Sequence, residues 1–477
     1  MFLSEFTPAA PEIVLLGLIC VVLLADLFIS DENRVLTYWI SIGALFITAL
    51  TLMATAPDAR IELFDGSYVS DQLSQLLKLS AVGMVAVGFL YARDYLKQND
   101  LLKGEYFLLG LFGLLGIMIM ISANSLLTMY LGLETLSLSL YALVAFERNS
   151  AVAAESAMKY FVLGAIASGA LLYGISWVYG ITGTIQFDEI AAVLRARPEL
   201  NALPLWFGMA FLIVGIAFKF GGVPFHMWLP DVYQGARSPV TLFIATAPKI
   251  AALALTLRIL VDGFGDLHGV WQGMLMVVGV LSLIIGNVVA IAQSNIKRML
   301  GYSAIAHVGF ILLAIFTGSA DGYGAAVFYT LTYVVMAAGA FGIVILLSSQ
   351  GYEAEAISDF KGLNARSPWF ALMMLFFMFG MAGVPPWVGF FAKLNVINAV
   401  LEAGFPGYAV LMVLASVVGA YYYLRVIWYM YFDEPVDRTI FRTQTDTRVV
   451  LSLNGLAVLA LGILPGWLLK LCLDVVS

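Results

Sequence analysis

The chain has 477 residues, of which 62% are hydrophobic and only 12% are charged, and its formal net charge is −7 at pH 7. Soluble domains carry about 25% charged residues, so this composition excludes an ordinary soluble protein and predicts an integral membrane protein. The two cysteines, Cys20 and Cys472, lie near opposite ends of the chain, and the sequence has no CxxC motif. Iron–sulfur clusters and structural zinc sites are therefore not expected in this chain.

Apolar runs recur along the whole chain and predict an all-α bundle of about 14 transmembrane helices. Two segments between these runs, residues 184–197 and 433–447, have mixed charge with apolar spacing, which predicts amphipathic surface helices. The predicted spans cover residues 10–29, 35–55, 72–92, 106–122, 125–146, 157–180, 203–230, 238–261, 269–293, 296–317, 322–349, 367–401, 406–431 and 448–473.

The distribution of lysine and arginine predicts the orientation of the bundle. Loops after odd-numbered spans, together with the span ends next to them, hold thirteen of these residues, and the loops and span ends on the other side hold four. Basic residues favour the cytoplasmic side, and a miscounted span would scramble the ratio. We therefore expect a multi-pass protein with both termini on the side opposite the cytoplasm.

Two of the predicted spans contain helix-breaking residues. The stretch KFGGVPFHMWLP at 219–230 places Gly221, Gly222 and Pro224 inside an apolar run. The pattern returns 161 residues later, where Gly383 and Pro385 interrupt the run at 367–401. Glycine lacks a restraining side chain and proline lacks an N–H, so both segments are predicted to be discontinuous helices.

The two broken helices are five spans apart, so they run in opposite directions. This arrangement is typical of inverted-topology repeats. We expect two inverted five-helix repeats, formed by spans 4–8 and 9–13. The predicted domains are 1–104 (helices 1–3), 105–262 (first repeat), 263–432 (second repeat) and 433–477 (amphipathic linker and helix 14).

Ionisable residues within the apolar spans are the main functional signal. Lys219, Lys249 and Lys393 lie near the middle of their spans, Glu134 is the clearest acid in such a position, and His307 lies within the tenth span. A charge at the bilayer centre costs about 2.5–3.5 kcal/mol on insertion scales. The lysines must therefore be paired, hydrated or deprotonated, and a group poised between these states can carry a proton.

Other ionisable residues in the spans have more than one interpretation. Arg258 and Arg425 lie near span ends and are expected to extend to the interface, and the same is plausible for Lys78. Lys159 lies near the start of its span, which leaves its role open.

His226 either closes a broken helix end or takes part in proton transfer. For His307, a relay role is favoured over simple packing, and Pro248 is expected to kink the helix that carries Lys249.

Several stretches resemble one known family. KFGGVPFHMWLPDVYQGARSPVT, the APK at 247–249, QSNIKRMLGYSAIAHVG and AGVPPWVGFFAK are similar to the antiporter-like membrane subunits of respiratory complex I, which are related to subunits of sodium/proton antiporters. Within the family, Lys393 and the end of the chain at Ser477 favour the branch with a terminal lysine. One sibling branch would carry glutamate there, and another would continue into a long lateral helix.

The resemblance implies a role for each of these residues. Glu134 would pair with Lys219, Lys249 would be the connecting lysine, His307 would link two half-channels, and Lys393 would be the terminal lysine. Lys159 matches a further lysine of one branch. The lysines are not at equivalent repeat positions, because Lys219 precedes its GGVP whereas Lys393 follows its AGVP by eight residues.

The resemblance also implies partners, cofactors and location. Flavin mononucleotide, iron–sulfur clusters and quinone would be bound by other subunits, with no cofactor in this chain. The partners would be other membrane-arm subunits, including another antiporter-like subunit and small membrane subunits, together with the lipid bilayer and no nucleic acid. The location would be the cytoplasmic membrane of a bacterium, with both termini on the periplasmic side.

Three other functions remain open from the sequence. A cation/proton antiporter would use the same groups for exchange, and co-purification with redox subunits would distinguish it. A solute carrier would share the inverted repeats but would have one central pocket. A purely structural scaffold is disfavoured by the number of ionisable groups inside the spans.

Overall fold

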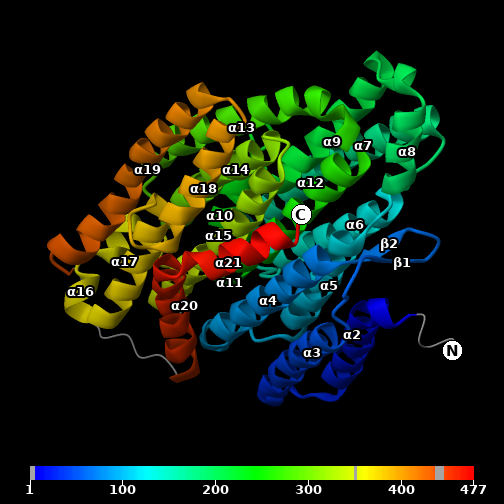
Figure 1. Ribbon diagram of the computed structural model, residues 1–477. Helices are drawn as coiled ribbons and strands as arrows, with labels where there is room; N and C mark the ends of the chain where they lie inside the picture. Colours follow the sequence, from blue (N-terminus) through cyan, green and yellow to red (C-terminus); the bar gives the residue numbers. More distant parts are fainter. Residues whose placement is uncertain (1–5, 349–351, 436–444, 477) are drawn as a thin grey trace. The chain divides into compact units, whose positions relative to one another are not determined.

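A computed structural model describes residues 6–348, 352–435 and 445–476, and helices make up most of this part of the chain (Figure 1). Thirteen helical stretches within the described residues are long and apolar enough to cross a membrane. They correspond to the predicted spans with one exception, the predicted span 367–401, which is divided into two shorter helices. The all-α membrane fold with broken helices is therefore confirmed. The predicted helix over 433–447 lies largely on residues 436–444, outside the described ranges.

The chain forms two compact units, and unit 1 comprises Met1–Phe89, Leu102–Lys219 and Ala247–Met274. Its central helix is α5, which is buried along most of its length and packs against α6, α12 and α2. The elements that lie wholly or mostly in unit 1 are η1 (Thr7–Ala9), α2 (Ala10–Phe28), η2 (Asp31–Asn33), α3 (Val35–Ala54), β1 (Ile61–Leu63), β2 (Tyr68–Ser70), α4 (Gln72–Gln98), α5 (Gly104–Ser122), α6 (Leu126–Val144), α7 (Ala151–Thr182), α8 (Phe187–Ala196), η3 (Pro198–Leu200), α9 (Leu203–Phe220), α12 (Ala247–Leu257), the π-helix η4 (Arg258–Gly263) and η5 (Gly265–Leu267).

A small antiparallel hairpin closes one end of unit 1. Strands β1 and β2 pair with Glu62 opposite Val69, and the hairpin lies beside the start of α6 (Figure 1). The Asn124 N–H donates to the Ser67 carbonyl at 3.0 Å. Helix α8 confirms the predicted amphipathic helix at 184–197, because its buried residues recur at helical spacing: Phe187, Ile190, Ala191 and Leu194.

Unit 2 comprises Leu90–Leu101, Phe220–Thr246 and Leu275–Ser477. Helices α14 and α15 are buried along most of their length, and they pack against each other and against α18. The elements that lie wholly or mostly in unit 2 are α10 (Trp228–Gly235), α11 (Ser238–Ala245), α13 (His268–Ile291), α14 (Ile296–Phe316), α15 (Ala320–Leu347), η6 (Ile357–Phe360), α16 (Leu363–Arg366), α17 (Pro368–Ala382), α18 (Val388–Glu402), α19 (Pro406–Phe432), α20 (Thr445–Ile463) and α21 (Pro465–Asp474).

Both predicted helix breaks are present. Helix α9 ends at Phe220 and α17 ends at Ala382, and each is followed by a glycine in the left-handed region, Gly221 with φ +75° and Gly383 with φ +85°. Glycine adopts this conformation without the penalty that a Cβ atom would impose. The two breaks therefore correspond at an offset of 162 residues, whereas the sequence motif placed Gly222 opposite Gly383 at 161. The five-helix repeats remain a prediction.

A third interruption lies in the predicted eighth span. Helix α11 ends at Ala245 and α12 begins at Ala247, because Thr246 has a non-helical backbone with ψ −94°. The Thr246 hydroxyl donates to the Leu242 carbonyl at 2.9 Å. The kink predicted near Pro248 is thus confirmed as a break two residues before the proline.

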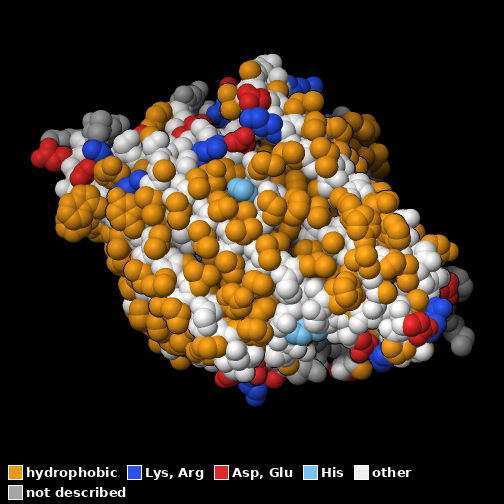
Figure 2. Space-filling model, turned by 90° about the horizontal axis from the view of Figure 1, so that it is seen from above, with side chains coloured by type: hydrophobic (Ala, Val, Ile, Leu, Met, Phe, Trp, Pro, Cys, Tyr) orange, Lys and Arg blue, Asp and Glu red, His pale blue; other side chains and the backbone are white. Residues whose placement is uncertain are grey.

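The outer surface fits a lipid environment. Apolar side chains are spread across the face shown in Figure 2, and the charged side chains gather in separate groups, mainly near its edges. Large apolar residues such as Leu27, Phe28 and Phe432 are more than two-thirds exposed. Lipid tails rather than water would cover side chains of this kind.

Candidate functional site

In unit 1, Glu134 and Lys219 each bond to a serine hydroxyl. The Lys219 amine donates to the Ser137 hydroxyl at 2.5 Å, and Ser137 lies one turn after Glu134 on α6. The Glu134 carboxylate accepts a hydrogen bond from Ser168 on α7, and the Ser168 hydroxyl lies 3.0 Å from that of Tyr130. Glu134 and Lys219 are both half-buried and interact electrostatically. The structure thus places the acid and the lysine in one polar cluster.

Lys249 lies deeper in unit 1 than Lys219. Its side chain is 2% exposed on α12, which packs against the central helix α5. The break at Thr246 lies three residues before it and interrupts the regular hydrogen bonding of the helix backbone. At such a break, backbone polar groups are free to bond to side chains or to water. A buried amine beside the break can therefore be stabilised by backbone carbonyls or by water.

In unit 2, His307 is held between two tyrosine hydroxyls. Its Nδ1 atom lies 2.7 Å from the Tyr329 oxygen, and its Nε2 atom lies 3.0 Å from the Tyr423 oxygen. The Tyr423 hydroxyl also contacts Ser303, one turn before His307 on α14. The Tyr333 ring packs against the imidazole with centroids 4.8 Å apart. Both ring nitrogens therefore have a hydroxyl through which a proton can pass.

Lys393 reaches from one half of its broken helix to the other. Its amine lies on α18 and donates at 2.8 Å to the carbonyl of Ala382, the last residue of α17. The carbonyl end of a helix carries partial negative charge, so this position favours a cation. The side chain is 8% exposed, and its amine lies 5.4 Å from the centre of the Phe310 ring.

His307 and Lys393 both line one small cavity. Its volume is about 10 Å³, which is at the lower limit for holding one water molecule. One water in this space could bridge the imidazole and the amine. The polar residues around the cavity are Asn287, His307, Lys393, Ser416, Tyr422 and Tyr423.

The remaining predicted residues lie outside these clusters. Lys159 is about half exposed on α7 and pairs with Glu155, one turn earlier, at 2.9 Å. His226 is half-buried between α9 and α10, and its backbone carbonyl accepts the Leu229 N–H at 2.9 Å. The helix-closing role of His226 and the open role of Lys159 both stay predictions.

Two residues expected to extend to the interface are instead buried. Lys78 and Arg258 are each 2% exposed, because carboxylates inside unit 1 pair with them. Arg425 is half-buried and donates to the backbone carbonyls of Ile291 and Gln293. The expectation of extended side chains at Lys78 and Arg258 was therefore wrong.

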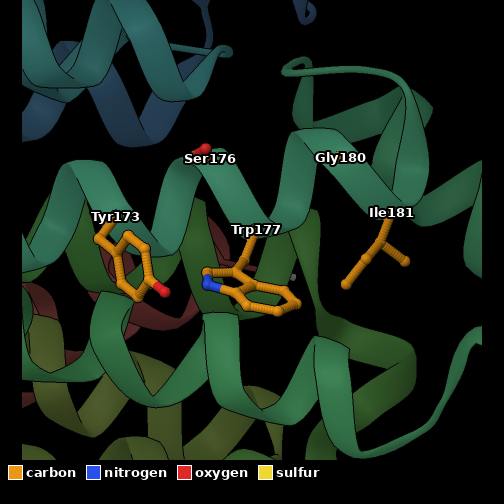
Figure 3. Close-up of a pocket in the computed structure, with 5 residues that line it drawn as sticks. All are labelled: Tyr173, Ser176, Trp177, Gly180 and Ile181. Atoms are coloured by element: carbon orange, nitrogen blue, oxygen red, sulfur yellow. The ribbon is translucent and has the colours of Figure 1, made fainter.

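An open groove of about 360 Å³ lies on α7, away from the buried amines of unit 1. Figure 3 shows the rings of Tyr173 and Trp177 on one side of the helix and Ser176 on the other. The groove is lined by Tyr173, Ser176, Trp177, Gly180 and Ile181. None of these is a lysine, arginine, histidine or carboxylate, so the groove shares no residue type with the predicted proton-transfer residues.

Several polar partners were missed from the sequence. A run of three tyrosines at 421–423 within an apolar span was a visible signal, and it contains Tyr423. Ser303 and His307 are spaced four residues apart, which places them on one helix face. Within the described residues, no group of three or more His, Cys, Asp or Glu could hold a metal ion.

Comparison with known proteins identifies the family. Residues 123–419 match the model of the transmembrane family described as NADH:quinone oxidoreductase/Mrp antiporter. The "NADH-quinone oxidoreductase subunit N" of Thioalkalivibrio sulfidiphilus is 55% identical over 476 residues, covering 100% of this chain and 99% of that protein. The chain belongs to the subunit N family. The predicted family and branch are thereby confirmed.

Solved structures agree with this family. A chain of respiratory complex I from Thermus thermophilus has 31% identity and a TM-score of 0.82, covering 96% of this chain and 98% of that one. A chain of the Mrp complex from Dietzia sp. has 20% identity and a TM-score of 0.86, with coverages of 100% and 97%. The second likeness shows the fold alone. This chain and that Mrp chain thus share an architecture, which by itself does not establish a function.

Proposed function

We propose that this chain is a proton-translocating membrane subunit of NADH–quinone oxidoreductase. It lies in the cytoplasmic membrane of a bacterium, with both termini on the periplasmic side and with other membrane-arm subunits as its neighbours. Redox chemistry takes place in those other subunits, which hold the flavin, iron–sulfur clusters and quinone. The observation that carries the proposal is the placement of buried amines at interruptions of apolar helices.

In unit 1, the switch is the cluster of Glu134, Ser137 and Lys219. A carboxylate nearby favours the protonated amine, and burial favours the neutral one. Displacing Glu134 would therefore weaken the hold of Lys219 on its proton. The proton then passes to Lys249, in the order predicted from the sequence.

In unit 2, the geometry supports transfer from His307 to Lys393. The imidazole can accept a proton at one nitrogen and release another from the opposite side, since each nitrogen faces a hydroxyl. The Tyr423 hydroxyl and the Lys393 amine line the same cavity, and one water bound there would complete a path between them. Lys393 is the last group before release on the periplasmic side.

The first prediction concerns the switch in unit 1. Lys219→Ala and Glu134→Ala should each lower NADH-driven proton pumping at least about tenfold, because proton transfer groups contribute rate factors of this order or more. Pumping is measured with a pH-sensitive dye in inverted membrane vesicles. NADH oxidation with an artificial electron acceptor checks that the peripheral arm has assembled.

Lys103→Ala is the matched control, because Lys103 is an exposed lysine just before α5. It should pump normally. Undiminished pumping in both Lys219→Ala and Glu134→Ala would overturn the proposal. If the chain purified without redox subunits and exchanged cations for protons, the antiporter function would replace it.

A further inference from the structure

Two buried cations in unit 1 are not used by the proposed proton path. Lys78 on α4 lies 2.6 Å from the Glu12 carboxylate, and its amine donates to the Tyr68 hydroxyl at 3.0 Å. That hydroxyl also lies 3.0 Å from Glu12, so the three groups form a closed triangle. Lys78 and Glu12 are each less than a tenth exposed. This ion pair ties α2 and strand β2 to α4.

Arg258 forms the second cluster, at the start of the π-helix. Its guanidinium lies 2.8 Å from Asp71 and 3.0 Å from Asp262. It also donates to the carbonyl of Ile121, at the end of α5, at 3.3 Å. Asp71 in turn accepts a hydrogen bond from the Ser74 N–H at 2.8 Å and so caps the N-terminus of α4. Arg258 thus joins three segments that converge at this end of unit 1.

Both clusters belong to the same end of unit 1. Asp71 and Asp262 follow the second and eighth predicted spans, which are both even-numbered, and Lys78 is seven residues beyond Asp71 on α4. Lys249 precedes Arg258 by nine residues in the same interrupted helix, which corresponds to about 14 Å along the axis. The paired cations therefore lie between the buried Lys249 and the predicted periplasmic end of unit 1.

The chemistry of these pairs opposes proton transfer. A guanidinium does not release its proton in proteins, and a carboxylate held by a buried cation has little tendency to take one up. Burial alone would raise the pKa of Asp71, but the Arg258 charge and the bonds from Ser74 outweigh it and keep the pKa below its ordinary value. A fixed arginine excludes protons from some channels in a similar way.

We propose that Glu12, Tyr68, Lys78, Asp71, Arg258 and Asp262 form an outer seal that prevents protons on Lys249 from leaving unit 1 at this end. The inference rests on the proposed function, since it assumes that Lys249 carries protons. Removing a cation would leave buried carboxylic acids that can bind and release protons. The seal would then become a path through which protons leak.

The test measures passive proton leak without NADH. Vesicles containing the assembled complex are given a pH gradient, and its collapse is followed with a pH-sensitive dye. Arg258→Gln should collapse the gradient several-fold faster than the wild type. Arg195→Gln is the matched control, because Arg195 is largely exposed and pairs with Asp266 at 3.0 Å, also after an even-numbered span. It should leave the leak unchanged.

A double variant separates a specific leak from general loosening. Adding Lys249→Ala to Arg258→Gln should return the leak to the wild-type rate, because the path to the seal is then interrupted. An unchanged leak in assembled Arg258→Gln overturns the proposal, and so does a leak that persists in the double variant. If Arg258→Gln does not assemble, Lys78→Met replaces it with the same expected leak, and a wild-type leak in that variant overturns the seal.

The seal and the proposed function fail in different ways. Normal pumping in Lys219→Ala and Glu134→Ala would remove the proposed function, whatever the leak rates. Normal leak in Arg258→Gln would remove the seal while leaving the pumping results untouched.

Discussion

At the scale of single residues, four basic side chains within the helices fall into two classes according to their partners. Lys219 and Lys393 donate to neutral oxygens, a serine hydroxyl and a backbone carbonyl. Lys78 and Arg258 instead contact carboxylates within 3 Å. If a side chain of the first class lost its proton, no carboxylate at hydrogen-bonding distance would be left without a cation. If a side chain of the second class lost its proton, the carboxylate bonded to it would be left unpaired. The first class is therefore suited to proton transfer and the second to holding structure together.

The Tyr423 hydroxyl tests the second half of the proposed path. Tyr423→Phe removes the group 3.0 Å from His307 Nε2 while keeping the ring. One hydrogen bond to a charged group is worth about 1.5–3 kcal/mol, so proton pumping should fall by about tenfold or more. The measurement is the ratio of pumped protons to oxidised NADH in vesicles.

Tyr421→Phe provides the control on the same helix, because Tyr421 is 56% exposed. Its pumping should equal that of the wild type. A Tyr423→Phe complex with an unchanged ratio would exclude this hydroxyl from the path and leave Tyr329 as the tyrosine partner of the imidazole.

At the scale of elements, the broken helices explain an asymmetry in the sequence. Lys219 lies before its glycine and Lys393 lies well after its own, so the two lysines appear non-equivalent along the chain. In the structure, Lys219 lies in the last turn of α9, and Lys393 reaches back to the last carbonyl of α17. Both lysines thus belong to the carbonyl end of the first half-helix, where a positive charge is favoured.

Gly383 makes this arrangement possible and can be tested directly. Its φ is +85°, and a Cβ atom there would lie 2.8 Å from the Lys393 side chain. Gly383→Ala should cost about 1–2 kcal/mol for the left-handed backbone and should also displace Lys393 from the Ala382 carbonyl. We expect both a lower unfolding temperature and reduced pumping.

Gly404→Ala separates these two effects. Gly404 has nearly the same φ, +86°, but a Cβ atom there has no heavy atom within 4 Å. It should show a similar loss of thermal stability with normal pumping. Equal pumping in the two assembled variants would show that the position of Lys393 does not depend on Gly383.

The broken helices also show which features of the site could be predicted from the sequence. Glycine, proline and buried lysine were visible without a structure, because each is unfavourable in an apolar helix unless something compensates. The compensating partners were not visible, since Tyr423 is 116 residues from His307 and Ser137 is 82 residues from Lys219. Sequence spacing predicts neighbours along one helix, but it does not predict which helices pack together.

At the scale of the whole molecule, loop contacts agree with the predicted alternation of spans. In unit 2, Arg237 follows the seventh span and Lys297 lies in the first turn of the tenth. They lie 3.0 and 3.9 Å from Glu353, which follows the eleventh span. In unit 1, Arg60 and Asp188 follow the second and sixth spans and are 2.7 Å apart. Segments that follow odd-numbered spans thus contact one another, and so do segments that follow even-numbered spans. The direction of the bundle relative to the cytoplasm rests on the distribution of basic residues.

Labelling of single cysteines tests that direction. In a chain without Cys20 and Cys472, Asn149→Cys and Glu199→Cys place thiols in exposed loops after the fifth and sixth spans. A membrane-impermeant maleimide should label Asn149→Cys in inside-out vesicles and Glu199→Cys in right-side-out vesicles, because basic loops stay in the cytoplasm. Both should react equally in detergent, which checks that each thiol is accessible. The opposite pattern would invert the membrane orientation, and the outer seal would then face the cytoplasm. Labelling of both thiols from one side would contradict the alternation of the spans themselves.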